Sequence, residues 1–187
     1  MIALASTSVH KADELGRLLG CPVAPIDGYD APIEDGATFL ANATIKARAG
    51  RVQAPSATLV LADDSGLVVD ALDGAPGILS ARFGGPGLDD QGRVAHLLAE
   101  LLGVESRVAA FVCVLVALGP DGVLQHAEGR VEGAIALAPR GSSGFGYDPV
   151  FVPAGHDRAV GEMSAAEKDA LSHRGRAARL LARTIGL

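Results

Sequence analysis

The chain has 187 residues, of which 49% are hydrophobic and 20% are charged, and this balance excludes a disordered tail or linker. A formal net charge of -6 argues against a non-specific nucleic-acid binder, because such a protein needs a basic surface. With no signal peptide and no run approaching ~18 apolar residues, we expect a cytoplasmic protein without a membrane or nucleic-acid partner.

The first half of the chain predicts strands that alternate with helices. Residues 1–5 form an apolar strand, and the leucine spacing of residues 9–19 predicts a helix that ends at Gly20. Thr38 is placed to cap a second helix that runs to about Val52. This order is typical of α/β proteins.

An apolar run at residues 58–62 is followed by two adjacent carboxylates, Asp63 and Asp64, and then by Ser-Gly. The run predicts a buried strand, a turn at the acidic residues and a partner strand at 67–71. Unpaired carboxylates are costly to bury, whereas Mg²⁺ is usually held by one or two carboxylates plus phosphates. An ordinary polar turn is the alternative from these residues alone.

Two long strands dominate the second half of the chain. Residues 108–118 and 123–135 are strand-like runs, and the Gly-Pro-Asp-Gly sequence between them predicts a hairpin. An amphipathic helix is expected from Asp89 or Asp90 to about Leu102. Together with the first half, this pattern predicts an α/β fold with a mixed, twisted sheet flanked by helices.

The C-terminal region is expected to contain a helix break. On one continuous helix, Lys168, His173 and Arg174 would spread around the axis and could not converge on one ligand. We therefore predict a break near residues 170–172 and a final helix over 173–185. His173 and Arg174 then lie in its first turn, where free backbone N–H groups attract anions.

The turn between the first strand and the first helix is rich in hydrogen-bond donors. It reads Ser-Thr-Ser-Val-His-Lys over residues 6–11, and a helix N-terminus suits phosphate binding. Ordinary capping by Ser8 is the alternative, and the nearby Lys11 favours anion binding. For Lys46, another of only three lysines in the chain, we expect a solvated helix face.

Residues 139–149 form a glycine-rich loop that carries Phe145 and Tyr147. Aromatic side chains that alternate with glycine on a loop are poor core material and suit stacking on a flat ring such as a purine. Asp148 could accept hydrogen bonds from a base. A decorated hairpin turn is the alternative. Neither a P-loop motif nor the context of a dinucleotide fingerprint is present.

Taken in order, six blocks of sequence resemble the inosine and xanthosine triphosphate pyrophosphatase family, whose members hydrolyse non-standard purine nucleoside triphosphates. The blocks are Leu4-Ala-Ser-x-Ser-x-x-Lys11, Glu34-x-Gly-x-Thr-Phe-x-x-Asn-Ala43 with Lys46, Ala62-Asp-Asp-Ser-Gly-Leu67, Gly74-Ala-Pro-Gly-x-x-Ser-Ala-Arg82, Gly144-Phe-Gly-Tyr-Asp-Pro-x-Phe151, and Glu167-Lys168 with Ser172-His-Arg174. Two positions depart from the family pattern. Ser6-Thr7-Ser8 replaces the usual Thr-Gly-Asn, and Ala41 replaces an acid.

The resemblance implies an elongated α/β fold over residues 1–187, with a central sheet shared by two lobes and a nucleotide cleft between them. It implies a homodimer that cleaves dITP, ITP or XTP with Mg²⁺ to the monophosphate and pyrophosphate, removing them from the nucleotide pool. By position, Asp64 binds Mg²⁺ and activates the water, and Glu34 is a second acidic ligand. The residues implied to bind the substrate are Ser6, Thr7, Ser8, Val9, His10, Lys11, Ser65, Phe145, Gly146, Tyr147, Asp148, Lys168, His173 and Arg174.

Within this set we expect different roles. The turn at residues 6–11, with Lys168, would hold the triphosphate, and the His173–Arg174 segment would read the 6-oxo group of the base. Because neighbouring side chains of a strand point to opposite sides, Asp64 is expected to be the metal ligand and Asp63 to be structural.

Two other functions remain alternatives. The opening Leu-Ala-Ser-x-Ser is also similar to the Maf nucleotide pyrophosphatases, which would change the base specificity. The same fold could also serve a non-catalytic nucleotide-binding or sensor protein. The Ser-His-Arg and Phe-Gly-Tyr-Asp blocks favour the first family.

Overall fold

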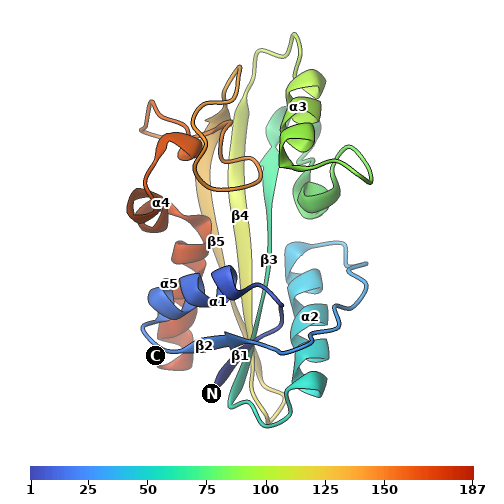
Figure 1. Ribbon diagram of the computed structural model, residues 1–187, viewed down its shortest axis with the longest axis vertical. Helices are drawn as coiled ribbons and strands as arrows, with labels where there is room; N and C mark the ends of the chain where they lie inside the picture. The colour runs from blue at the N-terminus through green and yellow to red at the C-terminus, as the bar shows by residue number, and fades with distance from the viewer. The chain divides into compact units, whose positions relative to one another are not determined.

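The computed structural model describes all 187 residues, and helices and strands alternate in its first half as the sequence predicts (Figure 1). The elements are β1 (Ile2–Leu4), α1 (Val9–Leu19), β2 (Val23–Pro25), α2 (Phe39–Gln53), β3 (Leu59–Val69), α3 (Asp90–Glu100), β4 (Val108–Leu118), β5 (Leu124–Ile135), β6 (Phe151–Pro153), α4 (Ala165–Leu171) and α5 (His173–Ile185). A six-stranded sheet has the order β2-β1-β3-β4-β5-β6. Because β1 is parallel to β2 and β3 whereas β6 is antiparallel to β5, the predicted mixed α/β sheet is confirmed.

The predicted helix starts agree with the capping geometry. Side-chain oxygens of Ser8, Thr38, Asp89 and Ser164 accept backbone N–H groups at the first turns of α1, α2, α3 and α4. The predicted break is confirmed as well, because α4 ends at Leu171 and α5 begins at His173. Local sequence signals therefore place the helix ends well.

The turn predicted at Asp63–Asp64 is wrong. β3 runs without interruption from Leu59 to Val69, through both carboxylates and the following Ser-Gly. Both aspartates are buried within the strand. The strand can continue because each carboxylate is paired with at least one cation from another element. Pairing offsets the cost of burying a charge.

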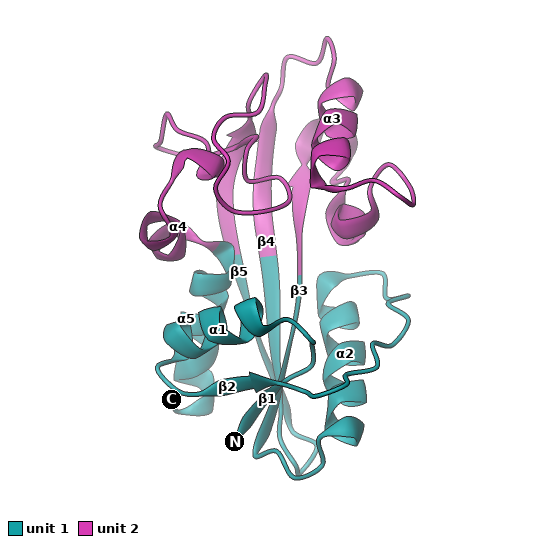
Figure 2. Cartoon of the chain, viewed as in Figure 1, with its two compact units in different colours: residues 1–64, 113–129, 173–187 teal, residues 65–112, 130–172 magenta.

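The chain divides into two compact units (Figure 2). Unit 1 contains residues 1–64, 113–129 and 173–187, and unit 2 contains residues 65–112 and 130–172. The boundary along β3 falls directly after Asp64. No helix in the structure has the length and apolar character needed to cross a membrane.

In unit 1, the strands have helices on both sides, with α1 and α5 on one side and α2 on the other (Figure 1). Leu61 of β3 belongs to the core cluster shared with α1 and α5. Its neighbours Val60 and Ala62 belong to the cluster shared with α2. This period of two continues to the aspartates, so Asp63 follows Leu61 and Asp64 follows Ala62.

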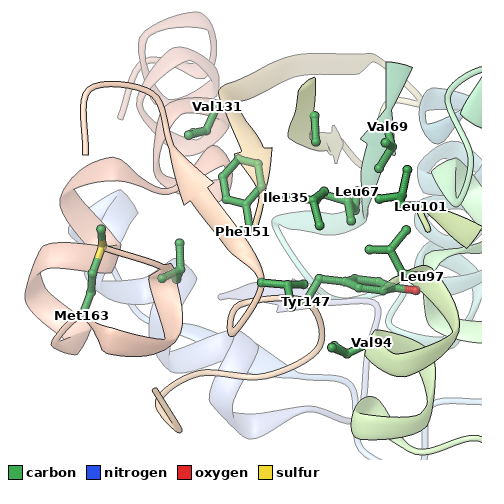
Figure 3. Close-up of a cluster of buried hydrophobic side chains, with 13 residues drawn as sticks. Leu67, Val69, Val94, Leu97, Leu101, Val131, Ile135, Tyr147, Phe151 and Met163 are labelled. Atoms are coloured by element: carbon green, nitrogen blue, oxygen red, sulfur yellow. The ribbon is translucent and has the colours of Figure 1, made fainter. Parts of the chain in front are cut away.

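Unit 2 has its own core, in which aliphatic side chains pack with Phe151 and Tyr147. The ring of Tyr147 lies beside Val94 and Leu97 (Figure 3). Its hydroxyl donates a hydrogen bond of 2.9 Å to the carbonyl oxygen of Ser80. Tyr147 is only 5% exposed, so a partner for its hydroxyl is needed.

Candidate active site

Asp63 on β3 is enclosed by cations on the side of α1 and α5. Its carboxylate accepts from Lys11 Nζ at 3.0 Å and from Arg174 Nη2 at 3.3 Å. Arg174 is 3% exposed and its other terminal nitrogen donates to Glu14 at 2.8 Å. Burial by itself would raise the pKa of Asp63, but Lys11, Arg174 and Lys46 outweigh it and hold that pKa well below its usual range. Asp63 is therefore a charged, paired group inside the fold.

Asp64 faces α2 and has a different environment. Its Oδ1 accepts from Lys46 Nζ at 3.3 Å, and its Oδ2 accepts from Asn42 Nδ2 at 3.2 Å. Burial raises the pKa of Asp64 above its usual value, and the opposing effects of Lys46 and Asn42 do not cancel it. Glu34 adds to the rise because it is a second negative charge.

Lys46 joins Asp64 to Glu34. Its ammonium group lies 3.2 Å from Glu34 Oε2 and 3.3 Å from Asp64 Oδ1. The side chain is 12% exposed, so the expectation of a solvated helix face for Lys46 is wrong. Burial would lower the pKa of Lys46, but Asp63, Asp64 and Glu34 raise it above its usual value, so Lys46 stays charged.

Four of these charged groups border a pocket in unit 1 with a volume of about 170 Å³. The pocket is lined by Ala5, Ser6, Thr7, Lys11, Tyr29, Ala31, Glu34, Lys46 and Asp63. The hydroxyl of Tyr29 donates to the backbone carbonyl of Lys46 at 3.2 Å. Two lysines and two carboxylates thus share a small space with the turn that precedes α1.

That turn is organised by its own hydroxyl groups. Ser8 Oγ accepts from the backbone N–H of Lys11 at 3.3 Å, and Ser6 Oγ accepts from the backbone N–H of Ser8 at 3.1 Å. Both oxygens act as acceptors here, so each O–H can still donate to an anion. Thr7, Val9 and His10 are exposed. Capping by Ser8 and anion binding are therefore compatible rather than exclusive.

The donor set fits a hard cation such as Mg²⁺. No group of three or more His, Cys, Asp or Glu side chains is arranged to hold a metal ion. Instead, Asp64 and Glu34 already share one positive charge, the ammonium of Lys46. Two carboxylates that complete their coordination with substrate phosphates and waters are the usual protein contribution to a Mg²⁺ site.

The predicted base-binding loop lies in unit 2, and its two aromatic residues differ. Phe145 is 58% exposed, and Lys168 Nζ lies 4.3 Å from the centre of its ring. Tyr147 is part of the core, so the interpretation that it is poor core material is wrong. Asp148 is buried, and its Oδ2 accepts from Lys168 Nζ at 2.6 Å and from the N–H of Phe145 at 2.8 Å.

Residues 2–184 match the family model described as Ham1 family. The chain belongs to the Ham1 family. It is 46% identical over 192 residues to a protein of Corynebacterium diphtheriae named dITP/XTP pyrophosphatase, covering 94% of this chain and 92% of that one.

Solved structures agree with this membership. The structure of a HAM1 protein from Coxiella burnetii matches with a TM-score of 0.89 and 37% identity, over 99% of this chain and 98% of that one. A Mycobacterium abscessus structure, titled nucleoside-triphosphatase / dITP/XTP pyrophosphatase, matches with a TM-score of 0.79 and 43% identity. It covers 98% of this chain and 96% of the other.

In this Ham1-family chain, unit 1 brings together five of the sequence-predicted residues. Ser6, Thr7, Lys11 and Glu34 line the pocket, and Asp64 is linked to Glu34 through Lys46. Lys168 lies with Phe145 and Asp148 in unit 2 instead. Ser65 and His173 are partly buried at the boundaries of the units.

The sequence analysis assigned no role in the site to three of its side chains. Tyr29 lines the pocket, and Asn42 and Lys46 bond to Asp64. The sequence did contain a signal that Asn42 and Lys46 act together, because they lie four residues apart on the helix that Thr38 caps. Residues with that spacing share one helix face.

Proposed function

We propose that this chain is a dITP/XTP pyrophosphatase that cleaves non-standard purine nucleoside triphosphates between the α- and β-phosphates. The observation that carries the proposal is the cluster at the pocket of unit 1. Lys46 lines this pocket together with Glu34 and the donor-rich turn before α1, and it also pairs with Asp64. A chain of 46% identity bears the name dITP/XTP pyrophosphatase, and this supports the same activity here.

The turn before α1 would hold the phosphates. A triphosphate carries about four negative charges, and a protein of net charge -6 needs locally placed cations to bind it. The N-terminus of α1 offers backbone N–H groups, the hydroxyls of Ser6 and Ser8 can donate, and Lys11 adds a positive charge. Lys11 is one-third exposed, so part of its ammonium group faces solvent while it pairs with Asp63.

Asp64 would act as the general base. Burial raises its pKa toward the operating pH, which makes its carboxylate a better proton acceptor for the attacking water. Asp64 and Glu34 would hold Mg²⁺, and the metal, when bound, neutralises negative charge on the phosphate oxygens. Asn42 and Lys46 keep the carboxylate of Asp64 oriented while the proton moves.

Residues of unit 2 and the start of α5 would bind the base and sugar. The exposed ring of Phe145 is available for stacking, and Asp148 and Lys168 hold the loop around it. A donor that faces O6 is left unpaired when adenine binds, which discriminates strongly against ATP. His173 is our candidate for that donor. The guanidinium of Arg174 is bonded to Asp63 and Glu14, so its direct contact with the base would require those bonds to break.

The finer parts of the proposal rest on family resemblance. These are a nucleotide cleft between two lobes, a homodimer and a cytoplasmic location. Light scattering after size-exclusion chromatography tests the homodimer, for which the expected mass is twice the 18.9 kDa of one chain. A mass of one chain would contradict the homodimer.

One assay tests the activity. Purified protein is incubated with Mg²⁺ and dITP, XTP, dATP or dGTP, and phosphate is measured with and without added inorganic pyrophosphatase. The proposal expects phosphate only when pyrophosphatase is present, and mainly from dITP and XTP. Nucleotide binding without turnover would favour the sensor alternative, and turnover of other nucleotides in preference would favour the Maf-like alternative.

A further inference from the structure

Asn42 closes a ring of contacts around the two proposed metal ligands. Its Oδ1 accepts from the backbone N–H of Gly36 at 2.8 Å, and its Nδ2 donates to Asp64 Oδ2 at 3.2 Å. Lys46 continues the ring from Asp64 to Glu34, and Glu34 is two residues from Gly36. We propose that Asn42 is a positioning residue that aligns Asp64 with the segment carrying Glu34, an inference that rests on the proposed Mg²⁺ site.

The orientation of the Asn42 amide follows from chemistry. A backbone N–H can only donate, so the side-chain oxygen of Asn42 must face Gly36. The amide nitrogen then has to face Asp64, where a carboxylate can only accept. One planar amide thus bonds to both partners. Rotating it by half a turn would set its nitrogen against the N–H of Gly36 and its oxygen against the carboxylate of Asp64.

Helix geometry fixes where this amide lies. Asn42 is 0% exposed in the first turns of α2, and Lys46 follows one turn later on the same helix face. Thr38 caps the helix, and Ala43 and Ala47 pack it against β3 in a shared core cluster. Because α2 is held at its end and along its length, Asn42 and Lys46 approach Asp64 as a fixed pair.

The segment that carries Glu34 packs closely against the first turn of α2. A Cβ added at Gly36 would lie 2.6 Å from Asn42 Oδ1 and 2.7 Å from Ala41 Cβ, so this position has no room for a side chain. Gly36 does not have a positive φ, and close packing rather than backbone conformation therefore requires glycine here. The segment that carries Glu34 is thus tied to Asp64 through one backbone N–H and one amide, in addition to the link through Lys46.

Two variants separate positioning from a merely structural role. Asn42→Ala removes both hydrogen bonds. Asn42→Asp keeps an acceptor for Gly36 but places a carboxylate oxygen against Asp64 instead of an N–H donor. Ala47→Gly is the matched control, because it loosens α2 against β3 without touching a bond of the ring. Asp64→Asn tests the metal site itself.

The first readout is Mn²⁺ binding to nucleotide-free protein, followed by electron paramagnetic resonance. Residues that orient metal ligands typically contribute about 10- to 100-fold in metal affinity or activity, and we expect Asn42→Ala to weaken Mn²⁺ binding by about that factor. Ala47→Gly is expected to lower the melting temperature but to bind Mn²⁺ as the wild type does. Equal Mn²⁺ affinity of Asn42→Ala and the wild type would overturn the proposal.

The second readout is turnover of dITP at saturating Mg²⁺, with the melting temperature measured in parallel. Asn42→Asp is expected to keep the fold at a lower melting temperature, because it buries a carboxylate against Asp64, and to lose about tenfold or more in kcat, because Asp64 loses its donor. Wild-type kcat in Asn42→Asp would overturn the role of Asn42. If instead Asp64→Asn binds Mn²⁺ and turns over dITP normally, the metal site is wrong, and that outcome differs from a failure of Asn42 alone.

Discussion

Asp63 and Asp64 are consecutive residues of β3 whose carboxylates bond to cations on opposite faces of the strand. Asp63 pairs with Lys11 and Arg174, whereas Asp64 pairs with Lys46, a cation that Glu34 shares. As a result, the pKa of Asp63 is lowered and the pKa of Asp64 is raised. The fold therefore stabilises the charge of one carboxylate and opposes that of the other, so we expect the same substitution to have different consequences at the two positions.

Asp64→Asn is expected to abolish Mg²⁺-dependent turnover of dITP with a smaller loss of stability than Asp63→Asn. A raised pKa means that the folded protein disfavours the charge of Asp64, although the new amide nitrogen must face a donor, either Lys46 Nζ or Asn42 Nδ2. Turnover should fall by at least about 10³-fold, because the proposed base and metal ligand are lost together. Pyrophosphate release and the melting temperature are measured on one preparation, and near-normal rates would refute the assigned role.

Asp63→Asn is expected to destabilise the protein, in a way that depends on pH. Removing one partner of a buried ion pair leaves Arg174 and Lys11 without their shared counter-ion, which costs about 3 kcal/mol or more at neutral pH. The lowered pKa of Asp63 means that its contribution is complete above the unfolded value near 3.9 and declines below it, by roughly 1.4 kcal/mol per pH unit.

Urea unfolding of wild type and Asp63→Asn at several pH values tests this. The difference in free energy of unfolding should be constant from neutral pH down to about pH 5 and should shrink toward about pH 3. A difference that is small at neutral pH, or that grows on acidification, would contradict the pairing of Asp63.

Lys46→Met is expected to raise the pKa of Asp64 further. After burial, Lys46 has the largest effect on that pKa and acts to lower it, so its removal favours the neutral acid. Titration of the carboxyl carbon by NMR in metal-free protein measures the change directly. Arg48→Met is the control, because it removes an exposed cation from the same helix. Equal upward shifts in both variants would show a general charge effect instead.

Local signals in the sequence predicted the helices of this fold better than the acidic strand. Ser8, Thr38 and Asp89 each cap a helix where the sequence indicates a cap, because a cap and its N–H partner lie within three residues. The interruption of β3 was predicted wrongly because the cations that pair with Asp63 come from residues 52 and 111 positions away. Nothing near Asp63 indicates them.

In the candidate site, too, features that depend on residues distant in sequence were the ones predicted wrongly. Motif resemblance identified Asp64, Glu34 and Lys11, but the burial of Lys46 was missed because it depends on how α2 packs against β3. Tyr147 was assigned to a surface because its hydroxyl partner, Ser80, is 67 residues away. Side chains whose partners are distant in sequence were those that pattern reasoning placed wrongly.

Phe145 and Tyr147 are two residues apart, yet we expect their substitutions to affect different properties. Phe145→Ala removes an exposed ring, so stability should change by no more than about 0.5 kcal/mol. If the ring stacks on the base, KM for dITP should rise by about tenfold, since such stacking is worth about 1–3 kcal/mol. Phe145→Tyr keeps the ring and serves as the matched control, with KM close to that of the wild type.

Tyr147→Phe should show the reverse pattern. It keeps the buried ring but removes the hydroxyl that donates to Ser80 at 2.9 Å, leaving a buried carbonyl without its partner. The free energy of unfolding should fall by about 1 kcal/mol, whereas KM for dITP should not change. Steady-state kinetics and urea unfolding on the same variants distinguish the two residues. A rise in KM for Tyr147→Phe comparable to that of Phe145→Ala would show that the tyrosine hydroxyl contacts the nucleotide, and its assignment to the core of unit 2 would then fail.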